Sequence, residues 1–404
     1  MKTLDASFFA GNRRAAMDKL QGGLLVIAGY TGMQKSNDEE FRFTQESNMW
    51  YLTGIEFPDW WLIMDGGSGK SWLVEPTIDE RLRLFTESLA AEDAKAKSGV
   101  DTVLSRDAAM TMLRRLAKTH SLVHTVGQSP YSEHFTFALN PAIADMKTTL
   151  ERTFVKVEDF RLPLARLRAI KQPVEIDAMQ KAIDVTMAGL SQVKENLQSY
   201  RHEYDIDAEL GYAFRKAGGT HGFDPIVASG KNATVAHYFQ NNAALKKGTF
   251  VMMDVGAKLN GYPADLTRTF AYGKPTKRMA SVHEAVRIMQ AEIIELIKPG
   301  VSLEEYQRES DAIIKREMIK LGVMNGPDDE QAFRRHMPHA LSHGLGIDVH
   351  DALGRPREFQ PGMVLTVEPG VYLQDEGIGV RIEDDILVTE SGKKNMSAKL
   401  STTF

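Results

Sequence analysis

The chain has 404 residues, a formal net charge of −5 and no cysteine. A chain of this length exceeds one ordinary hydrophobic core, so two domains are expected. The slight acidic excess argues against a nucleic-acid partner, because nucleic-acid-binding proteins typically carry a basic patch. The lack of cysteine excludes disulfides, thiol nucleophiles and cysteine-ligated zinc.

The sequence shows neither a secretion signal nor a membrane-spanning pattern. The apolar run at residues 24–30 is too short, and too close to turn residues, for the hydrophobic part of a signal peptide. No run approaches the ~18 apolar residues of a transmembrane helix. We therefore expect a cytoplasmic protein without a membrane partner.

Residues 1–165 are expected to form an α/β domain, because short strands alternate with helical segments. Helical spacing of apolar residues predicts one helix over residues 101–119, and the aromatic and polar segment 43–54 is interpreted as a packed loop. Four short apolar runs bounded by Gly, Asp or Pro predict buried strands: residues 23–30, 60–65, 71–75 and 122–127.

The basic, proline-containing segment 160–173 predicts the domain boundary, and residues 166–404 are expected to form an α+β domain. Helical spacing predicts four helices in two pairs: residues 174–198, 205–216, 278–297 and 302–321. Strands are predicted between and after them: residues 225–229, 249–259, 261–270, 363–369 and 378–389.

The stretch 253–270 contains a predicted hairpin with two acids on one face. Asn260-Gly261 favours a two-residue turn, because both central residues tolerate positive φ. This register makes Asp254 and Asp265 diagonal neighbours, about 7–8 Å apart at Cα. Two such carboxylates repel unless a cation lies between them. A metal site is one interpretation; a solvated pair, with a bulge at Pro263 that shifts the register, is the other.

Two further clusters carry candidate chemistry. Glu368 and Glu383 each lie in a strand-like apolar segment, where a carboxylate is costly unless it is paired or metal-bound. Arg381 shares a face with Glu383 and is expected to hold a carboxylate of the substrate or of the site. Four histidines fall close together beside glycines that leave space for a close backbone approach: His336, His339, His343 and His350.

One imidazole and four carboxylates thus become candidate metal ligands. Such a donor set suits Mn²⁺, with Zn²⁺ and Co²⁺ as alternatives, and four negative charges balance two divalent cations. The five candidate ligands are Asp254, Asp265, His343, Glu368 and Glu383.

The motifs DVG(x)8D, SHGLG, VEPG and RIED, in this order, resemble the pita-bread metallopeptidases, which include methionine aminopeptidase, aminopeptidase P and prolidase. Longer stretches resemble the proline-specific branch, and bacterial aminopeptidase P within it. They are IVASGKNATVAHY (226–238), HALSHGLGIDVHD (339–351), PGMVLTVEPGVY (361–372), GIGVRIEDDILVTESG (377–392) and FTQESNMWYLTG (43–54). This resemblance implies a pita-bread catalytic domain, in residues 166–404, that follows the α/β domain.

The resemblance also implies a role for each candidate. Asp254, Asp265 and Glu383 would hold one divalent ion. The other would be held by Asp265, His343, Glu368 and Glu383, so that Asp265 and Glu383 bridge the pair. Glu368 would also move a proton from the bridging water to the leaving proline nitrogen. The remaining roles are substrate-directed: carbonyl binding by His350, orientation by His237 and Arg381, and a proline pocket shaped by His339, with Tyr372 near the metals.

The expected reaction is attack of a bridging hydroxide on the Xaa-Pro bond at a peptide N-terminus. The alternative within the family is a dipeptidase restricted to Xaa-Pro. The resemblance suggests a homodimer or homotetramer, in which residues 1–165 contribute to substrate access and to subunit contacts. One departure is Gly344, where a bulky aromatic is familiar, and it bears on the size of the substrate pocket.

Two other classes share this fold without metal chemistry. One is the metal-free hydrolase of the creatinase type, and the other is the non-catalytic binding domain found in histone chaperones. Both lose metal-ligand positions, whereas this chain keeps an acid or a histidine at all five. The sequence therefore favours the metallopeptidase.

Overall fold

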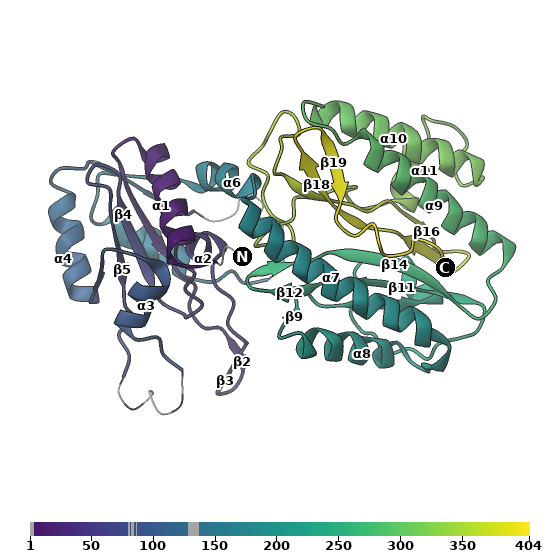
Figure 1. Cartoon of the computed structure of the whole chain (residues 1–404), viewed down its shortest axis with the longest axis horizontal. Coiled ribbons are helices and arrows are strands. Elements are labelled where there is room, and N and C mark those ends of the chain that lie inside the picture. Colours follow the sequence, from purple (N-terminus) through teal and green to yellow (C-terminus); the bar gives the residue numbers. More distant parts are fainter. Residues whose placement is uncertain (1–3, 80, 82–84, 86, 128–136) are drawn as a thin grey trace. The chain divides into compact units, whose positions relative to one another are not determined.

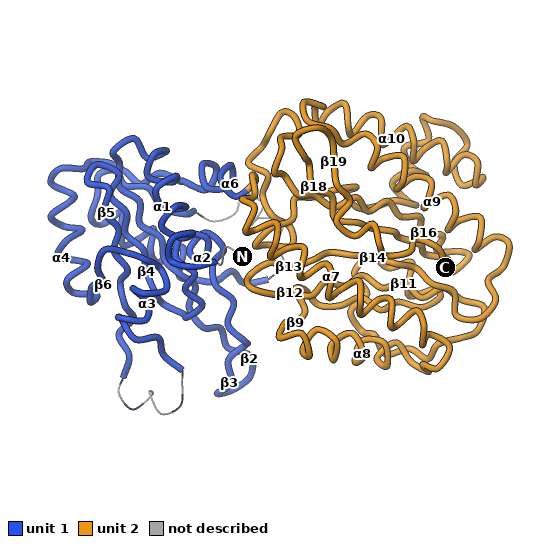
Figure 2. The backbone as a smooth tube through the Cα atoms, viewed as in Figure 1, with its two compact units in different colours: residues 1–168 blue, residues 169–404 orange. Residues whose placement is uncertain are grey.

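The computed structural model describes residues 4–79, 81, 85, 87–127 and 137–404. The chain divides into two compact units, residues 1–168 and 169–404, coloured separately in Figure 2. The division falls within the basic segment 160–173. Within the described residues, no helix is long and apolar enough to cross a membrane.

Unit 1 contains one six-stranded sheet with the order β6-β5-β4-β1-β7-β8. Its strands are β1 (Leu24–Ala28), β4 (Trp61–Asp65), β5 (Lys70–Val74), β6 (Thr102–Leu104), β7 (Leu122–Thr125) and β8 (Lys156–Asp159), and a separate pair is formed by β2 (Gln34–Ser36) and β3 (Glu39–Glu40). Its helices are α1 (Ala6–Leu20), α2 (Ser47–Thr53), α3 (Ala91–Ser98), α4 (Arg106–Leu116), α5 (Ala142–Glu151) and α6 (Arg161–Ala169), which runs across the division. Parallel and antiparallel pairs mix with these helices, so the expected α/β class is confirmed.

Two predictions for unit 1 are wrong. Residues 101–119 do not form one helix: β6 comes first, and α4 begins after Ser105, whose side chain accepts a hydrogen bond from the Ala108 amide at 3.3 Å. The segment 43–54 is not a loop, because it contains α2. Glu46 accepts from the Met49 amide at the start of α2, and Gly54 ends it at φ 67°. In both cases a capping side chain, rather than hydrophobic spacing, decides the boundary.

Unit 2 contains the four predicted helices and one short helix that was not predicted. The helices are α7 (Pro173–Asn196), α8 (Glu203–Lys216), α9 (Lys277–Leu296), α10 (Leu303–Lys320) and the additional α11 (Glu330–His336). Its first strands are β9 (Thr220–His221), β10 (Ile226–Ser229), β11 (Thr249–Val255), β12 (Ala257–Leu259), β13 (Tyr262–Pro263) and β14 (Leu266–Tyr272). The later strands are β15 (Val364–Val367), β16 (Gly370–Leu373), β17 (Ile378–Arg381), β18 (Asp384–Thr389) and β19 (Gly392–Asn395).

The strands of unit 2 lie between two helix pairs (Figure 1). Helices α7 and α8 pack against the earlier strands β10 to β14, whereas α9 contacts β15, β16 and β17 and packs against α10. A large apolar cluster fills the space beneath α9 and α10 and includes Met289, Ile314, Val367 and Ile386. Helix pairs around antiparallel strands confirm the expected α+β class.

The hairpin at Asn260-Gly261 has the predicted register. Leu259 pairs with Tyr262 and Asp254 with Thr267, and no shift occurs between these pairs, so the alternative of a bulge at Pro263 is wrong. Both turn residues have positive φ, 50° for Asn260 and 83° for Gly261. The two strands of this hairpin therefore place their acids as the alternation of side chains requires.

Candidate active site

A cavity of about 510 Å³ in unit 2 collects almost every predicted site residue. The predicted residues that line it are His237, Asp254, Asp265, His339, His343, His350, Glu368, Arg381 and Glu383. Tyr372 is buried beside this set, with its hydroxyl 2.8 Å from Nε2 of His339. Of the four clustered histidines, His336 is not among the lining residues; it lies on α11 and contacts the Tyr372 carbonyl at 3.0 Å.

Each acid of the site stands at the end of a strand. Asp254 belongs to β11 and Asp265 directly precedes β14, while Glu368 directly follows β15 and Glu383 lies between β17 and β18. The Glu383 amide donates to the Thr267 carbonyl at 3.1 Å and so joins β14 to the start of β18. Segments more than a hundred residues apart in sequence are thereby brought to one cavity.

His343 reaches the acids because its loop follows the edge of β15. The Thr366 amide donates to the His343 carbonyl at 3.0 Å, and the Glu368 amide donates to the Leu341 carbonyl at 3.0 Å. Gly344 also bridges to Leu365, and an added Cβ would lie 2.4 Å from the Asp351 carbonyl oxygen. Gly344 is not among the residues that line the cavity, so its small size serves loop closure rather than pocket volume.

The imidazole of His343 presents an unprotonated nitrogen to two carboxylates. Its Nδ1 lies 3.1 Å from the Gly344 carbonyl and donates to it, which leaves the Nε2 lone pair 3.5 Å from Asp265 Oδ2 and 3.5 Å from Glu368 Oε1. Burial and the neighbouring His350 lower the pKa of His343 to about 4, so the ring is neutral. A lone pair that faces carboxylate oxygens repels them unless a cation lies between.

The acids themselves are held close together away from water. Asp265, His343 and Glu383 each offer a ligand atom within 4.8 Å of the other two. Burial first, and then the neighbouring acids, raise the pKa of Asp265 and of Glu383 well above the usual range. Burial likewise raises the pKa of Glu368 to about 8. The cavity therefore contains more acidic groups than the basic groups of the protein can neutralise.

Asp254 is only half satisfied by protein groups. Its Oδ2 accepts from Nη2 of Arg381, whereas its Oδ1 is buried and has no hydrogen-bond partner among the described residues. A buried carboxylate oxygen without a partner is rare, and a metal ion is one of its established explanations. The donor set therefore fits divalent cations that prefer oxygen and imidazole ligands.

Arg381 is committed to the site rather than free for a substrate carboxylate. Besides Asp254, it donates from Nη1 to the Tyr372 hydroxyl at 2.6 Å and from Nε to Thr267 Oγ1 at 3.1 Å. Nδ1 of the neutral His339 ring donates to the Ala340 carbonyl at 2.8 Å, so its Nε2 accepts a proton from the Tyr372 hydroxyl. Of the two sequence-based alternatives for Arg381, the structure has it hold a site carboxylate.

The two remaining histidines lie in the same cavity. The ring centres of His350 and His343 are 4.2 Å apart, and burial followed by the positive field of His237 lowers the pKa of His350. The His237 ring stacks on Phe239 with 5.8 Å between centroids. Its loop is fixed by Glu203, which accepts from the Tyr238 hydroxyl at 2.8 Å, a contact that the sequence did not reveal.

Sequence reasoning missed two further polar residues of the site. Thr267 Oγ1 donates to Glu383 Oε2 at 2.6 Å while it accepts from Arg381. Asp385 Oδ2 accepts from the Asp265 amide at 3.2 Å. Each stands two residues after a predicted ligand, Thr267 after Asp265 and Asp385 after Glu383, so the period of two in a strand was the signal that could have found them.

This cavity has the donor set of a divalent-metal hydrolase, and comparison with known proteins agrees. The chain belongs to metallopeptidase family M24, which it matches over residues 177–390. Residues 9–124 match the family described as aminopeptidase P, N-terminal domain. The two-domain pita-bread architecture expected from the sequence is thus confirmed.

Similar proteins extend over the full length of the chain. The chain is 30% identical to the Xaa-Pro aminopeptidase of Escherichia coli (strain K12), over 99% of this chain and 96% of that protein. It is 32% identical to the Xaa-Pro aminopeptidase of Haemophilus influenzae, over 98% and 95%. Among solved structures, aminopeptidase P from E. coli in a low-pH form matches with a TM-score of 0.87 at 29% identity, covering 98% of this chain and 96% of that one.

Proposed function

We propose that this protein is an Xaa-Pro aminopeptidase, which hydrolyses the bond between the first residue of a peptide and a proline at the second position. The observation that carries this proposal is one cavity with five metal-ligand candidates, in a chain that is similar to Xaa-Pro aminopeptidases over 99% of its length. A dedicated enzyme is chemically reasonable, because proline lacks the N–H that general peptidase subsites bind and its φ is fixed.

We infer two divalent metal ions in the cavity, Mn²⁺ first, with Zn²⁺ and Co²⁺ as the alternatives. Asp254, Asp265 and Glu383 would hold one ion; His343 and Glu368, together with Asp265 and Glu383, would hold the other. Ions bound in this way lower the pKa of water and supply a hydroxide nucleophile at neutral pH. Two observations support these assignments: Nε2 of His343 is neutral, and Oδ1 of Asp254 has no hydrogen-bond partner among the residues that the structure describes.

Proton transfer falls to Glu368. Glu368 lines the cavity, with Oε1 3.5 Å from Nε2 of His343, so its carboxylate can accept a proton from water in the cavity and release it to a more basic atom. The proline nitrogen needs that proton in order to leave. Glu368 Oε2 lies 3.5 Å from Nδ1 of His339, whose own pKa is lowered by burial and by Arg381 to about 4, so His339 does not compete for the proton.

Substrate contacts fall to the histidines of the cavity. His350 and His237 bind the scissile carbonyl and orient the peptide, and His339 with Tyr372 forms one wall for the proline ring. Arg381 keeps Asp254 and Tyr372 in place through its direct hydrogen bonds to both. Residues 1–165 control access and subunit contacts, in a homodimer or homotetramer located in the cytoplasm.

The lining of the cavity favours the aminopeptidase over the dipeptidase. A dipeptidase must capture the free carboxylate that follows proline, which calls for an unpaired cation. Among the described residues that line the cavity, Arg381 is the only Lys or Arg, and each of its three nitrogens already donates to Asp254, Tyr372 or Thr267.

Parallel assays on Xaa-Pro and on Xaa-Pro-Yaa-Zaa peptides test the proposal. We expect turnover of the longer peptide in the presence of Mn²⁺, and loss of turnover after chelation. Strong activity on the dipeptide alone would make the enzyme a prolidase. Absence of activity on both, in protein that binds Mn²⁺, would refute proline specificity.

A further inference from the structure

Arg268 lies directly behind the proposed metal centre, on the face of β14 that points away from the cavity. Its neighbours Thr267 and Thr269 point toward Arg381: the Thr267 hydroxyl contacts the Arg381 guanidinium and Glu383, and the Thr269 hydroxyl donates to the Arg381 carbonyl. Because side chains alternate along a strand, Arg268 points the other way. Its side chain is buried, with an exposed fraction of 1%.

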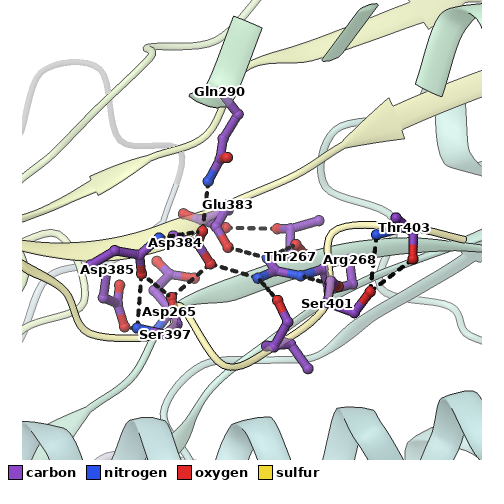
Figure 3. Close-up of polar contacts among 12 residues, drawn as sticks. Asp265, Thr267, Arg268, Gln290, Glu383, Asp384, Asp385, Ser397, Ser401 and Thr403 are labelled. Atoms are coloured by element: carbon purple, nitrogen blue, oxygen red, sulfur yellow. Dashed lines mark hydrogen bonds and ion pairs between the residues drawn. The ribbon is translucent and has the colours of Figure 1, made fainter. Parts of the chain in front are cut away.

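Every N–H of the Arg268 guanidinium has an acceptor (Figure 3). Nη1 donates to the carbonyls of Thr267 at 2.9 Å and Glu383 at 2.6 Å. Nη2 donates to Asp384 Oδ1 at 2.6 Å and to the Leu400 carbonyl at 3.1 Å, and Nε donates to the Ser401 carbonyl at 3.0 Å. One side chain thus fastens β14, the start of β18 and residues 400–401 to one another.

Asp384, the counter-ion of Arg268, is fixed just as fully. It accepts from Ser397 Oγ at 2.6 Å, from Gln290 Nε2 at 2.7 Å and from Asn395 Nδ2 at 2.8 Å. These donors come from α9 and from the segment that follows β18. Figure 3 shows the chain of contacts from Gln290 through Asp384 to Arg268.

Arg268 binds the main chain at one proposed bridging ligand, Glu383, and two residues after the other, Asp265. Thr267 follows Asp265 by two residues, and its carbonyl accepts from both Arg268 and the Glu383 amide. The Glu383 carbonyl also accepts from Arg268, so the backbone of Glu383 is tied on both sides. On the cavity side, by contrast, the carboxylates of Asp265 and Glu383 repel each other.

We propose that Arg268 is a positioning residue of the metal centre: it holds the backbones of Asp265 and Glu383 at the separation at which both can ligate the same cation. The inference rests on the metal site argued under Proposed function. Arg268 touches neither substrate nor ion and acts through the carbonyl of Glu383 and that of Thr267, which follows Asp265 by two residues. A lysine cannot replace it, because an ammonium offers three donors at one point and the guanidinium offers five in a planar fork.

The test compares Arg268→Lys with a matched control, Arg13→Lys, in the full-length protein. Arg13 is buried in unit 1 and likewise donates to several carbonyls, those of Leu52, Ser98 and Gly99. Metal-free protein is titrated with Mn²⁺ alone in a calorimeter, and thermal unfolding is recorded without metal. We expect both substitutions to lower Tm. Only Arg268→Lys should weaken Mn²⁺ binding, by about tenfold or more in Kd, the usual size of an outer-sphere effect.

A milder variant keeps the test decisive if Arg268→Lys does not fold. Ser397→Ala removes one hydrogen bond to Asp384 and leaves the guanidinium in place, so a smaller rise in the Kd for Mn²⁺, of about two- to fivefold, supports the proposal. Unchanged Mn²⁺ affinity in every folded variant, or an equal loss in Arg13→Lys, overturns it. If the unmodified protein binds no Mn²⁺, the proposed metal centre itself fails; if it binds Mn²⁺ and the variants bind equally well, only the role of Arg268 fails.

Discussion

The two faces of the strands that carry Asp265 and Glu383 handle buried charge in opposite ways. On the cavity face, four acids share one arginine, Arg381, and the pKa values of Asp265 and Glu383 are raised. On the other face, Asp384 forms a buried salt bridge with Arg268. Burial raises its pKa, but the Arg268 charge and the hydrogen bonds to Asp384 outweigh burial and leave that pKa below the usual range.

Burial is therefore not what separates the two faces, since Glu383 and Asp384 are adjacent and each is 2% exposed. The difference lies in the number of cations and donors available to each carboxylate. Asp384 accepts four hydrogen bonds from protein groups, whereas one oxygen of Asp254 has no partner among the described residues. The fold is therefore able to give a buried acid all its hydrogen-bond partners, as it does for Asp384. The unpaired oxygen of Asp254 then indicates a position where a ligand binds.

Removing a bridging acid from the cavity face should have the largest effect. Glu383→Ala takes a ligand from both proposed ions, and we expect Xaa-Pro turnover to fall by about a thousandfold or more, or about 4 kcal/mol of transition-state stabilisation. Metal content should fall, while thermal unfolding of the metal-free protein should show no loss of stability, because a repelling charge has gone.

Steady-state kinetics and metal analysis of the purified variant measure both effects. Glu376→Ala is the control, because Glu376 pairs with Arg278 outside the cavity and should leave turnover unchanged. Normal turnover in Glu383→Ala would contradict the bridging role.

On the face away from the cavity, removal of an acid should lower the stability of the fold rather than the activity. Asp384→Ala leaves Arg268 buried without its counter-ion, and we expect the free energy of unfolding to fall by about 3–5 kcal/mol. Urea denaturation of the metal-free protein measures it. Asp375→Ala, at a pair whose acid is 84% exposed, should change stability by about 1 kcal/mol at most. Equal effects of the two substitutions would show that the Arg268–Asp384 pair contributes no more than a surface pair.

Binding of metal should reduce the repulsion among the acids of the cavity face and so stabilise the protein. At an Mn²⁺ concentration of about 100 times its Kd, we expect stabilisation by about 3 kcal/mol, seen as a rise in Tm. In Asp265→Asn the rise should shrink, because one bridging carboxylate is lost. An equal rise in that variant would place the stabilising Mn²⁺ at another site.

The sequence predicted the candidate ligands of the cavity face but not the network behind it. Asp254 and Asp265 follow from the Asn260-Gly261 turn and strand alternation, which are local rules. Arg268 acts instead on carbonyls more than a hundred residues away, and nothing in its neighbourhood signals Glu383 or Leu400. Every residue type has a main-chain carbonyl, so the sequence does not indicate which carbonyls an arginine will contact. Such contacts are found only in the three-dimensional structure.

A long-range contact also contributes to one of the errors in unit 1, the single helix predicted over residues 101–119. The apolar residues Val103 and Met110, on either side of Ser105, have the spacing of one helix face, so the sequence predicted a single helix. Pairing of Val103 with Leu73 across β5 and β6 decided for a strand instead. Tertiary pairing overrides local propensity where the two conflict.

A neutral group on the face away from the cavity gives the smallest predicted effect. His283 is buried on α9, and its Nε2 donates to the Thr269 carbonyl at 3.1 Å, on the strand that carries Arg268. Burial lowers its pKa from 6.5 to about 4; Glu284 opposes the shift, while Arg287 and Lys194 add to it. Between these two values the unfolded chain binds the proton more readily, so stability falls as pH falls.

At pH 5 the loss relative to pH 7 that is due to His283 should be about 2 kcal/mol. His283→Gln keeps an N–H donor for Thr269 without the titration, so its unfolding free energy should depend less steeply on pH between 7 and 5. Urea denaturation at both pH values, with wild type in parallel, measures the difference. If the unfolding free energy of the two proteins depends on pH equally steeply, protonation of His283 does not destabilise the fold. An unpaired charge on this face would then destabilise it only at Arg268 and Asp384.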